Sequence, residues 1–233
     1  MKLTRPTWKS AVLLAILLLP SSIYLALTNG RHNFVHLQYV GPESPSGDYH
    51  TIPEFHLIDQ NGNPFSNSNL EGKVYLANFF FSRCPSVCPP MQFNMRRLQE
   101  RFAEYPDVSF VSFSVDPEYD TPEQLRSYAE ELGADLGNWH FLTGSRDEIY
   151  NLAARGYLVN VIEDSLAPGG FLHSEYIVIV DKEGHIRSGL DRFDNPRAVY
   201  DGTSPSDINE LIDDVKVLLA EYRLALKKNQ SRE

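Results

Sequence analysis

The chain contains an apolar run, Val74 to Phe81, that leads through Cys84-Pro-Ser-Val-Cys88-Pro-Pro into a helical pattern. The run has the length and the content of β-branched and aromatic residues that are typical of a buried parallel strand. Two prolines suit the first turn of a helix, where backbone N–H groups have no partner inside the helix. The sequence therefore places its only two cysteines where a buried strand turns into a helix.

Strand and helix patterns alternate along the remainder of the chain. We expect strands at 52–59, 108–115, 139–142, 173–181 and 185–190, and helices at 89–105, 121–132, 147–154 and 204–222. An Asn-Gly pair after the first strand predicts a hairpin, and Thr121 followed by Gln124 predicts a helix start. Segment 156–172 is predicted as a long loop, a feature that usually has a function. The alternation predicts an α/β fold with a mostly parallel sheet and an antiparallel hairpin at its edge.

Residues 10–28 are apolar apart from Pro20, Ser21 and Ser22. At about 1.5 Å per residue, such a stretch can cross a hydrocarbon core about 30 Å thick. Basic residues precede it, so we expect a single transmembrane anchor with residues 1–9 in the cytoplasm and the domain on the periplasmic side of a bacterial membrane. A cleaved signal peptide is the alternative, because it also begins with basic residues. No clean small-x-small cleavage site follows the stretch.

Residues 29–50 are polar and rich in turn-forming Pro, Gly and Ser, which favours a tether between the anchor at 10–28 and a globular domain at 51–227, with a tail at 228–233. The net charge of the chain is −10. Because residues 1–30 hold three basic and no acidic side chains, the remainder has a net charge of −13. Such an acidic domain is a poor candidate for binding nucleic acid.

The spacing of the cysteines, C-x-x-x-C, limits their chemistry. A structural disulfide is one interpretation, but closing so short a loop would contribute only about 2 kcal/mol. A position at a helix N-terminus instead favours reactive thiols, whose pKa the helix end lowers. Thioredoxin-type exchange uses the shorter C-x-x-C, and the cis-proline of those folds has no counterpart in Leu172-His173-Ser174. The proline that precedes the reactive cysteine of peroxiredoxins is also missing from 77–80.

Two thiolates and an imidazole would make a soft site with three ligands. Thiolates select Cu(I), and imidazole also accepts Cu(II). A structural zinc site needs a fourth ligand, and the chain has no third cysteine. His173 is distant in sequence from Cys84, yet strand ends meet at one edge of an α/β sheet, so the topology can bring the two segments together.

Four motifs together resemble the Sco/SenC family of thioredoxin-fold copper proteins, over about 52–222. They are Cys84-Pro-Ser-Val-Cys88-Pro, Ser114-Val-Asp-Pro-Glu-Tyr-Asp-Thr-Pro122, Phe171-Leu-His-Ser174 with Val180-Asp-Lys-Glu-Gly184, and Tyr200-Asp-Gly-Thr203. The resemblance implies a thioredoxin-like fold, with the 52–65 hairpin as an N-terminal extension. It also implies copper bound by Cys84, Cys88 and His173.

Two functions follow from this resemblance. The first is a copper metallochaperone that helps to assemble the dinuclear copper centre of cytochrome c oxidase. The second is a thiol–disulfide oxidoreductase that keeps the copper-ligand cysteines of the oxidase reduced, with Cys84 and Cys88 as catalytic residues. The implied partners are the copper-binding subunit of the oxidase, a copper donor protein and a thioredoxin-like reductant.

Other residues that could carry chemistry have simpler interpretations. The histidines outside the motifs fit solvated or hydrogen-bonded roles. Met91 and Met95 are one helical turn apart, which favours a core stripe. Asp116 and Asp120 are predicted to shape the loop before the helix at 121–132, and contact with a partner is the alternative.

Overall fold

The computed structural model describes residues 8, 16–20, 36–44, 46–163, 171–173 and 175–230, with only the backbone described for 162, 163, 171–173 and 229. The chain divides into two compact units, 1–35 and 36–233. In the first unit, residues 16–20 are helical. Within the described ranges, no helix combines the length and the apolar character needed to cross a bilayer. The predicted anchor, 10–28, lies mostly outside these ranges and stays a prediction.

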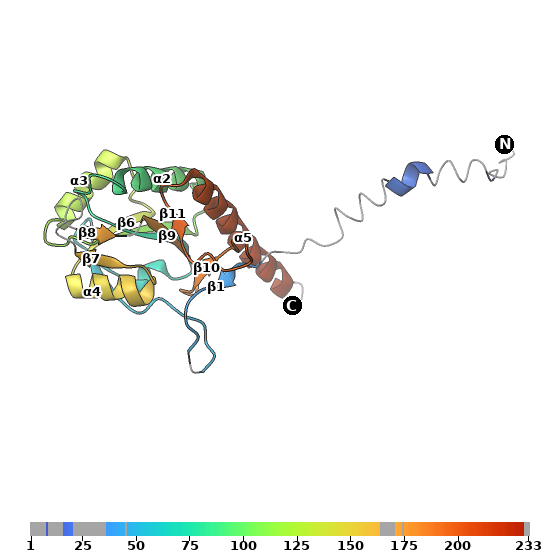
Figure 1. Ribbon diagram of the computed structural model, residues 1–233, viewed down its shortest axis with the longest axis horizontal. Helices are drawn as coiled ribbons and strands as arrows, with labels where there is room; N and C mark the ends of the chain where they lie inside the picture. The colour runs from blue at the N-terminus through green and yellow to red at the C-terminus, as the bar shows by residue number, and fades with distance from the viewer. Residues whose placement is uncertain are drawn as a thin grey trace. The chain divides into compact units, whose positions relative to one another are not determined.

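Among the described residues of the second unit, nine strands form a mixed sheet (Figure 1). The strands follow in the order β1-β10-β9-β4-β5-β6-β2-β3, and β11 also pairs with β9. Strands β4, β5 and β6 are parallel, and β9 and β2 flank them in antiparallel orientation. The strands are β1 (Gln38–Tyr39), β2 (His56–Asp59), β3 (Pro64–Ser66), β4 (Val74–Phe80), β5 (Val108–Ser114), β6 (Trp139–Thr143), β9 (Tyr176–Val180), β10 (Ile186–Ser188) and β11 (Tyr200–Asp201). The α/β class, the parallel centre and the β9–β10 hairpin agree with the prediction. The expectation of a mostly parallel sheet is wrong, because among the described strands only the β4–β5 and β5–β6 pairs are parallel.

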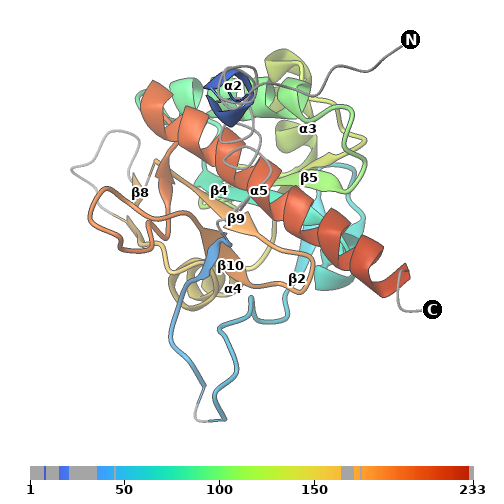
Figure 2. The ribbon, with the colours of Figure 1, turned by 90° about the vertical axis from the view of Figure 1, so that its right-hand side faces the viewer.

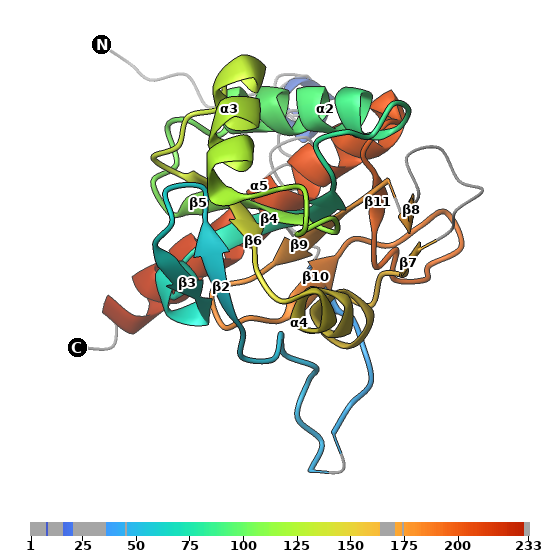
Figure 3. The same cartoon turned by 90° about the vertical axis from the view of Figure 1, so that its left-hand side faces the viewer.

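Helices cover both faces of this sheet (Figures 1 and 3). They are α2 (Cys88–Arg101), α3 (Pro122–Leu132), α4 (Arg146–Asn151) and α5 (Pro205–Gln230), with a 3-10 turn η1 (Asn67–Leu70) and a π-helical turn η2 (Leu152–Gly156) that continues α4. Successive residues of a strand point to opposite faces. Accordingly, Phe80 packs against Tyr128 of α3, and Phe79 packs against Tyr157, which follows η2. Helix α5 lies beside α2 (Figure 2). Leu98 of α2 and Ile208 of α5 line one groove between the two helices.

Local sequence signals predict the hairpin and the start of α3 correctly. The β2–β3 hairpin turns at Asn61-Gly62, and Gly62 has a φ of 79°, in the left-handed region that favours glycine. The carboxylate of Asp59 accepts hydrogen bonds from the backbone N–H groups of Asn61 and Asn63, both at 2.8 Å. At α3, the Thr121 hydroxyl accepts a hydrogen bond from the Gln124 N–H at 3.3 Å.

The structure differs from the prediction in the segment predicted as a tether, because its part from His36 onward belongs to the second unit. Strand β1 pairs with β10, where Tyr39 lies opposite Arg187. The buried Arg187 guanidinium donates to the Leu37 carbonyl oxygen and to Glu221, both at 2.9 Å, and it stacks on the Tyr39 ring. These partners are far apart in sequence, so no local pattern predicts that the segment joins the sheet.

The predicted loop 156–172 also contains regular structure. Strands β7 (Val161–Glu163) and β8 (Phe171–His173) form an antiparallel pair in which Val161 lies opposite His173. The strand predicted at 173–181 is therefore divided, since His173 ends β8 and β9 begins at Tyr176. Strands of three residues are too short to show the alternation on which strand prediction depends.

The half-buried His140 of β6 makes the domain sensitive to acid. Burial lowers its pKa to about 4, with a smaller effect from Lys73. The unfolded chain binds this proton near pH 6.5, so His140 stabilises the fold above that pH, and the stability is lost as the pH falls through 4. We expect His140→Phe to reduce the loss of unfolding free energy between pH 6.5 and 4 by about 2 kcal/mol. Urea unfolding across this range measures the effect.

The matched control is His56→Phe, since the His56 side chain is 73% exposed. This variant should keep the acid sensitivity of the parent chain. Equal pH dependence in His140→Phe and the parent chain would assign the acid sensitivity to other groups.

Candidate metal centre

The cysteine loop connects the carboxyl end of β4 to the first turn of α2. The backbone N–H of Cys84 donates to the Phe81 carbonyl oxygen at 3.2 Å, which turns the chain away from the strand. Cys88 is the first residue of α2, and the prolines that follow it lie in the first turn, as predicted. The first helical hydrogen bond runs from the Met91 N–H to the Val87 carbonyl oxygen. Both thiols are therefore held at a strand-to-helix junction.

Cys84 and Cys88 are not joined in a disulfide, and both are nearly inaccessible, with 6% of Cys84 and 1% of Cys88 exposed. Burial raises the pKa of the Cys88 thiol above its ordinary value, and the hydrogen bond with Cys84 acts in the same direction. A hydrogen bond with the Phe81 backbone lowers it, but by less. The expectation that the helix N-terminus lowers the thiol pKa is therefore wrong for Cys88. Taking a thiolate out of water costs more than one helix end returns.

The electrostatic surroundings also disfavour a thiolate at Cys88. The charges of Cys84 and Asp120 both raise its pKa. The pKa of Tyr128 is also raised. Burial is the largest cause, and the charges of the two nearby cysteines act in the same direction. A site of this kind keeps Cys88 protonated unless a cation takes the place of the proton, because a bound metal ion stabilises the thiolate directly.

A buried carboxylate, Asp120, holds the start of the cysteine loop. It accepts a hydrogen bond from the Ser82 N–H at 3.0 Å, and another from the Ser82 hydroxyl. It also accepts one from the hydroxyl of Ser114, the last residue of β5, at 2.5 Å. Because Ser82 is only two residues from Cys84, this carboxylate joins the cysteine loop to the end of the neighbouring strand.

A second contact between the same two loops lies nearer the surface. The Arg83 guanidinium donates to Asp116 at 2.5 Å, and it stacks on the Tyr119 ring with 4.1 Å between the guanidinium carbon and the ring centroid. The Asp116 N–H donates to the Ser114 hydroxyl. The Asp120 carboxylate thus shapes its own loop through Ser114, as predicted, whereas the Asp116 carboxylate binds Arg83; both aspartates bind the loop that carries the cysteines.

The histidine segment lies at the same end of the sheet as the cysteines. Strand β9 lies beside β4 (Figure 3). The two strands are antiparallel, and Ile177 near the start of β9 pairs with Asn78 near the carboxyl end of β4. His173 lies four residues before Ile177, in β8. The backbone topology therefore brings the two segments to one edge, as expected. The His173 side chain lies outside the described part of the structure, so its role as a ligand stays a prediction.

Among the described side chains, no three His, Cys, Asp or Glu residues are grouped closely enough to hold a metal ion. The other candidate residues have structural roles. Met91 and Met95 are buried in the core, which confirms that interpretation. His50 is bonded to the Gly156 carbonyl oxygen at 2.7 Å, and the His140 ring packs against Phe65.

Comparison with known proteins decides the family. The sequence model of the SCO1/SenC family matches residues 43–204. The chain belongs to the SCO1/SenC family. A curated relative, the SCO1 protein homolog of Bacillus subtilis strain 168, is 32% identical over 167 residues, which cover 71% of this chain and 81% of the relative.

Solved structures of Sco proteins share the fold. BsSco, described as a member of the Sco family of cytochrome c oxidase assembly proteins with a disulfide switch, is 31% identical with a TM-score of 0.62, covering 78% of this chain and 97% of its own. Arabidopsis thaliana ScoI with copper bound is 28% identical with a TM-score of 0.58, covering 73% of this chain and 98% of its own. The predicted family is confirmed, and the mixed α/β sheet matches the Sco fold.

Sequence reasoning missed how this SCO1/SenC site is anchored. The sequence predicts that Asp116 and Asp120 shape their own loop, but it does not predict that they bind Ser82 and Arg83 of the cysteine loop. Their pairing crosses two loops that are more than thirty residues apart. The signal that could have found them is the position of both loops at the carboxyl ends of adjacent parallel strands, β4 and β5.

We expect Asp120→Ala to destabilise the cysteine loop, because it leaves the N–H and hydroxyl of Ser82 and the Ser114 hydroxyl without their acceptor. The free energy of unfolding should fall by about 2–4 kcal/mol. Alkylation of Cys88 in the metal-free chain should become about tenfold faster, since this buried thiol reacts only when the loop opens. Mass spectrometry of the labelled chain measures the rate.

Asp59→Ala is the matched control. Asp59 is also a buried carboxylate that accepts hydrogen bonds from a turn, but its turn belongs to the β2–β3 hairpin. Asp59→Ala should lower the free energy of unfolding without changing the alkylation rate of Cys88 below the unfolding transition. Equal rates in the two variants would show that Asp120 does not hold the loop.

Proposed function

We propose that this chain is a copper metallochaperone that binds copper through Cys84, Cys88 and His173 and helps to assemble the dinuclear copper centre of cytochrome c oxidase. The observation that carries the proposal is the pair of buried thiols, joined by a hydrogen bond and not by a disulfide, at the strand-to-helix junction. The segment of His173 begins at the same edge of the sheet. Relatives in the family include a copper-bound ScoI and an oxidase assembly protein.

The donor set suits copper in both oxidation states. Two thiolates select Cu(I), and an imidazole adds a ligand that Cu(II) accepts. The apolar surroundings of Cys84 and Cys88 keep water away from a bound ion, and the anchored loop limits the rearrangement that binding requires. The expected recipient is the copper-binding subunit of the oxidase, and the expected supplier is a copper donor protein.

The second candidate is a thiol–disulfide oxidoreductase for the oxidase cysteines, with a thioredoxin-like reductant as its partner. The hydrogen bond between the two thiols favours it, because thiols in contact can form a disulfide. In such a step, Cys84 and Cys88 give up two electrons and two protons, and the disulfide of the target is reduced to two thiols. The His173 imidazole has no part in that balance, which separates the two functions.

Copper titration distinguishes the candidates. We expect His173→Ala to weaken Cu(II) binding by about 100-fold or more, because it removes a proposed ligand, and loss of a residue that only supports a ligand already costs about 10- to 100-fold. The Cys84→Ser/Cys88→Ser double variant and the disulfide form should bind no Cu(I), because neither offers a thiolate. Anaerobic competition for Cu(I), and titration of the full chain with Cu(II), measure these affinities.

The matched control is His56→Ala, which removes an exposed histidine of β2 and should leave copper binding unchanged. Unaltered Cu(II) affinity in His173→Ala, combined with disulfide reduction that depends on both cysteines, would favour the oxidoreductase instead.

We also propose that residues 10–28 anchor the chain in the membrane with the domain on the periplasmic side. The basic residues before the stretch and its length support the proposal. Placing lysines at Leu14 and Leu18 should release the chain from the membrane fraction, because each charge costs about 2.5–3.5 kcal/mol in a bilayer. A mature chain that begins after residue 28, shown by N-terminal sequencing, would establish a cleaved signal peptide.

A further inference from the structure

The motif Tyr200-Asp-Gly-Thr203 lies between the two segments that carry the proposed copper ligands. Its first two residues form β11, which pairs with the start of β9, where Tyr200 lies opposite Ile177. This motif contains none of the proposed ligands. Its position raises the question of what it does for the site.

Gly202 makes one hydrogen bond to each of the two segments. Its N–H donates to the Glu175 carbonyl oxygen at 2.7 Å, two residues after His173. Its own carbonyl oxygen accepts a hydrogen bond from the Asn94 side-chain amide at 2.8 Å, on the helix that begins at Cys88. The backbone of this single residue thus connects the histidine segment to the cysteine helix.

The space at this junction admits only a glycine. A Cβ added to Gly202 would lie 2.7 Å from Cγ of Met91, 3.0 Å from the Glu175 carbonyl oxygen and 3.2 Å from Cδ1 of Ile177. Met91 belongs to the cysteine helix, and Glu175 and Ile177 follow His173 in the chain. A larger residue would therefore push the two segments apart.

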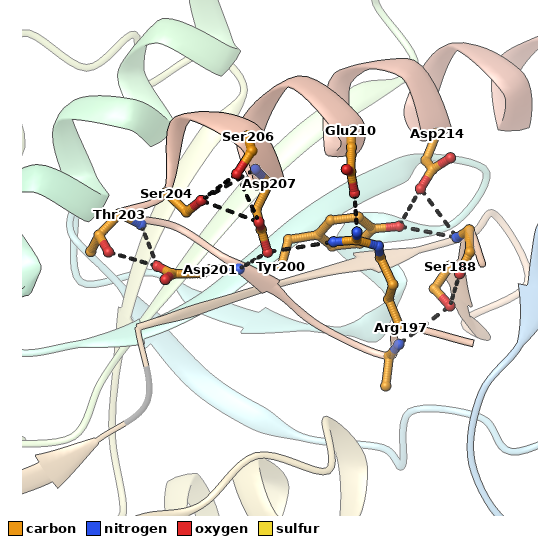
Figure 4. Close-up of polar contacts among 12 residues, drawn as sticks. Ser188, Arg197, Tyr200, Asp201, Thr203, Ser204, Ser206, Asp207, Glu210 and Asp214 are labelled. Carbon is orange, nitrogen blue, oxygen red and sulfur yellow. Dashed lines mark hydrogen bonds and ion pairs between the residues drawn. The ribbon is translucent and has the colours of Figure 1, made fainter. Parts of the chain in front are cut away.

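Helix α5 holds the junction in place (Figure 4). The Asp201 N–H donates to Asp207 at 3.1 Å, and the Asp201 carboxylate accepts hydrogen bonds from the N–H and the hydroxyl of Thr203. The buried Tyr200 hydroxyl donates to Asp214 at 2.5 Å. Because these contacts fix the residues on both sides of Gly202, the glycine acts as a rigid spacer and not as a hinge.

We propose that Gly202 is a positioning residue that sets the separation between the cysteine helix and the histidine segment, and thereby determines how strongly the site binds Cu(II) relative to Cu(I). The inference rests on the proposed copper site. A site for Cu(I) made of two thiolates depends on the cysteine loop alone. A site that also uses the imidazole needs the cysteine helix and the histidine segment at the correct separation. A change at the junction therefore affects Cu(II) more than Cu(I).

The test compares Gly202→Ala with Gly144→Ala in the full chain. Gly144 follows β6, two strands away from β4, and a Cβ there would also meet its nearest atom at 2.7 Å, in this case the end of the Leu57 side chain. We expect Gly202→Ala to weaken Cu(II) binding by about tenfold or more, the usual effect of lost support around a metal ligand, with Cu(I) affinity nearly unchanged. Gly144→Ala should change neither affinity.

A second variant, Asn94→Ala, removes one hydrogen bond of the junction without adding a clash. In the copper-free chain, both junction variants should increase amide hydrogen exchange of residues 171–177, whereas Gly144→Ala should not. Because Asn94→Ala introduces no steric conflict, it tests the proposal even if Gly202→Ala fails to fold.

The outcomes separate this inference from the proposed function. If His173→Ala weakens Cu(II) binding but neither junction variant changes the Cu(II) affinity or the exchange of 171–177, Gly202 has no positioning role. Equal losses of Cu(I) and Cu(II) affinity in the junction variants would also overturn the proposal, because they would indicate general destabilisation. If His173→Ala itself leaves Cu(II) binding intact, the copper site as proposed is wrong.

Discussion

The geometry of the site depends on one buried carboxylate, that of Asp120. Parallel strands leave their carboxyl ends at one edge of a sheet, but the loops beyond them have no ladder of hydrogen bonds to hold them. Asp120 provides this connection by binding Ser82 on one loop and Ser114 at the end of the next strand. A loop held in this way can keep two thiols out of water. Without such an anchor, a short loop containing prolines would expose them.

The sequence predicts the framework of this fold because the framework follows short-range rules. Buried strands, the Asn-Gly hairpin and the start of α3 at Thr121 each depend on residues within a few positions of one another. The placement of the cysteines at a helix start follows from the same patterns. So does the meeting of the histidine segment with the cysteine loop, since strand order brings their ends together.

The features that sequence reasoning missed depend on partners that are far apart in the chain. Strand β1 stays on the sheet because Arg187 binds the Leu37 carbonyl oxygen and Glu221 on α5. Strands β7 and β8 are too short to show a period. The shift of the Cys88 pKa has the opposite direction to the prediction, because a helix start is visible in the sequence whereas the depth of burial is a property of the whole fold.

The burial of Cys88 gives the proposed chaperone a property that its ligand set alone would not. An ordinary thiol is also protonated at neutral pH, but a raised pKa means that the proton is held more tightly, so a copper ion that binds Cys88 would have to displace a proton that is harder to remove. The reverse holds when copper leaves, because the vacated sulfur takes a proton back. In the proposed chaperone, metal transfer and proton uptake would then be a single exchange, and the local pH at the surface where the recipient docks would be part of the driving force for delivery.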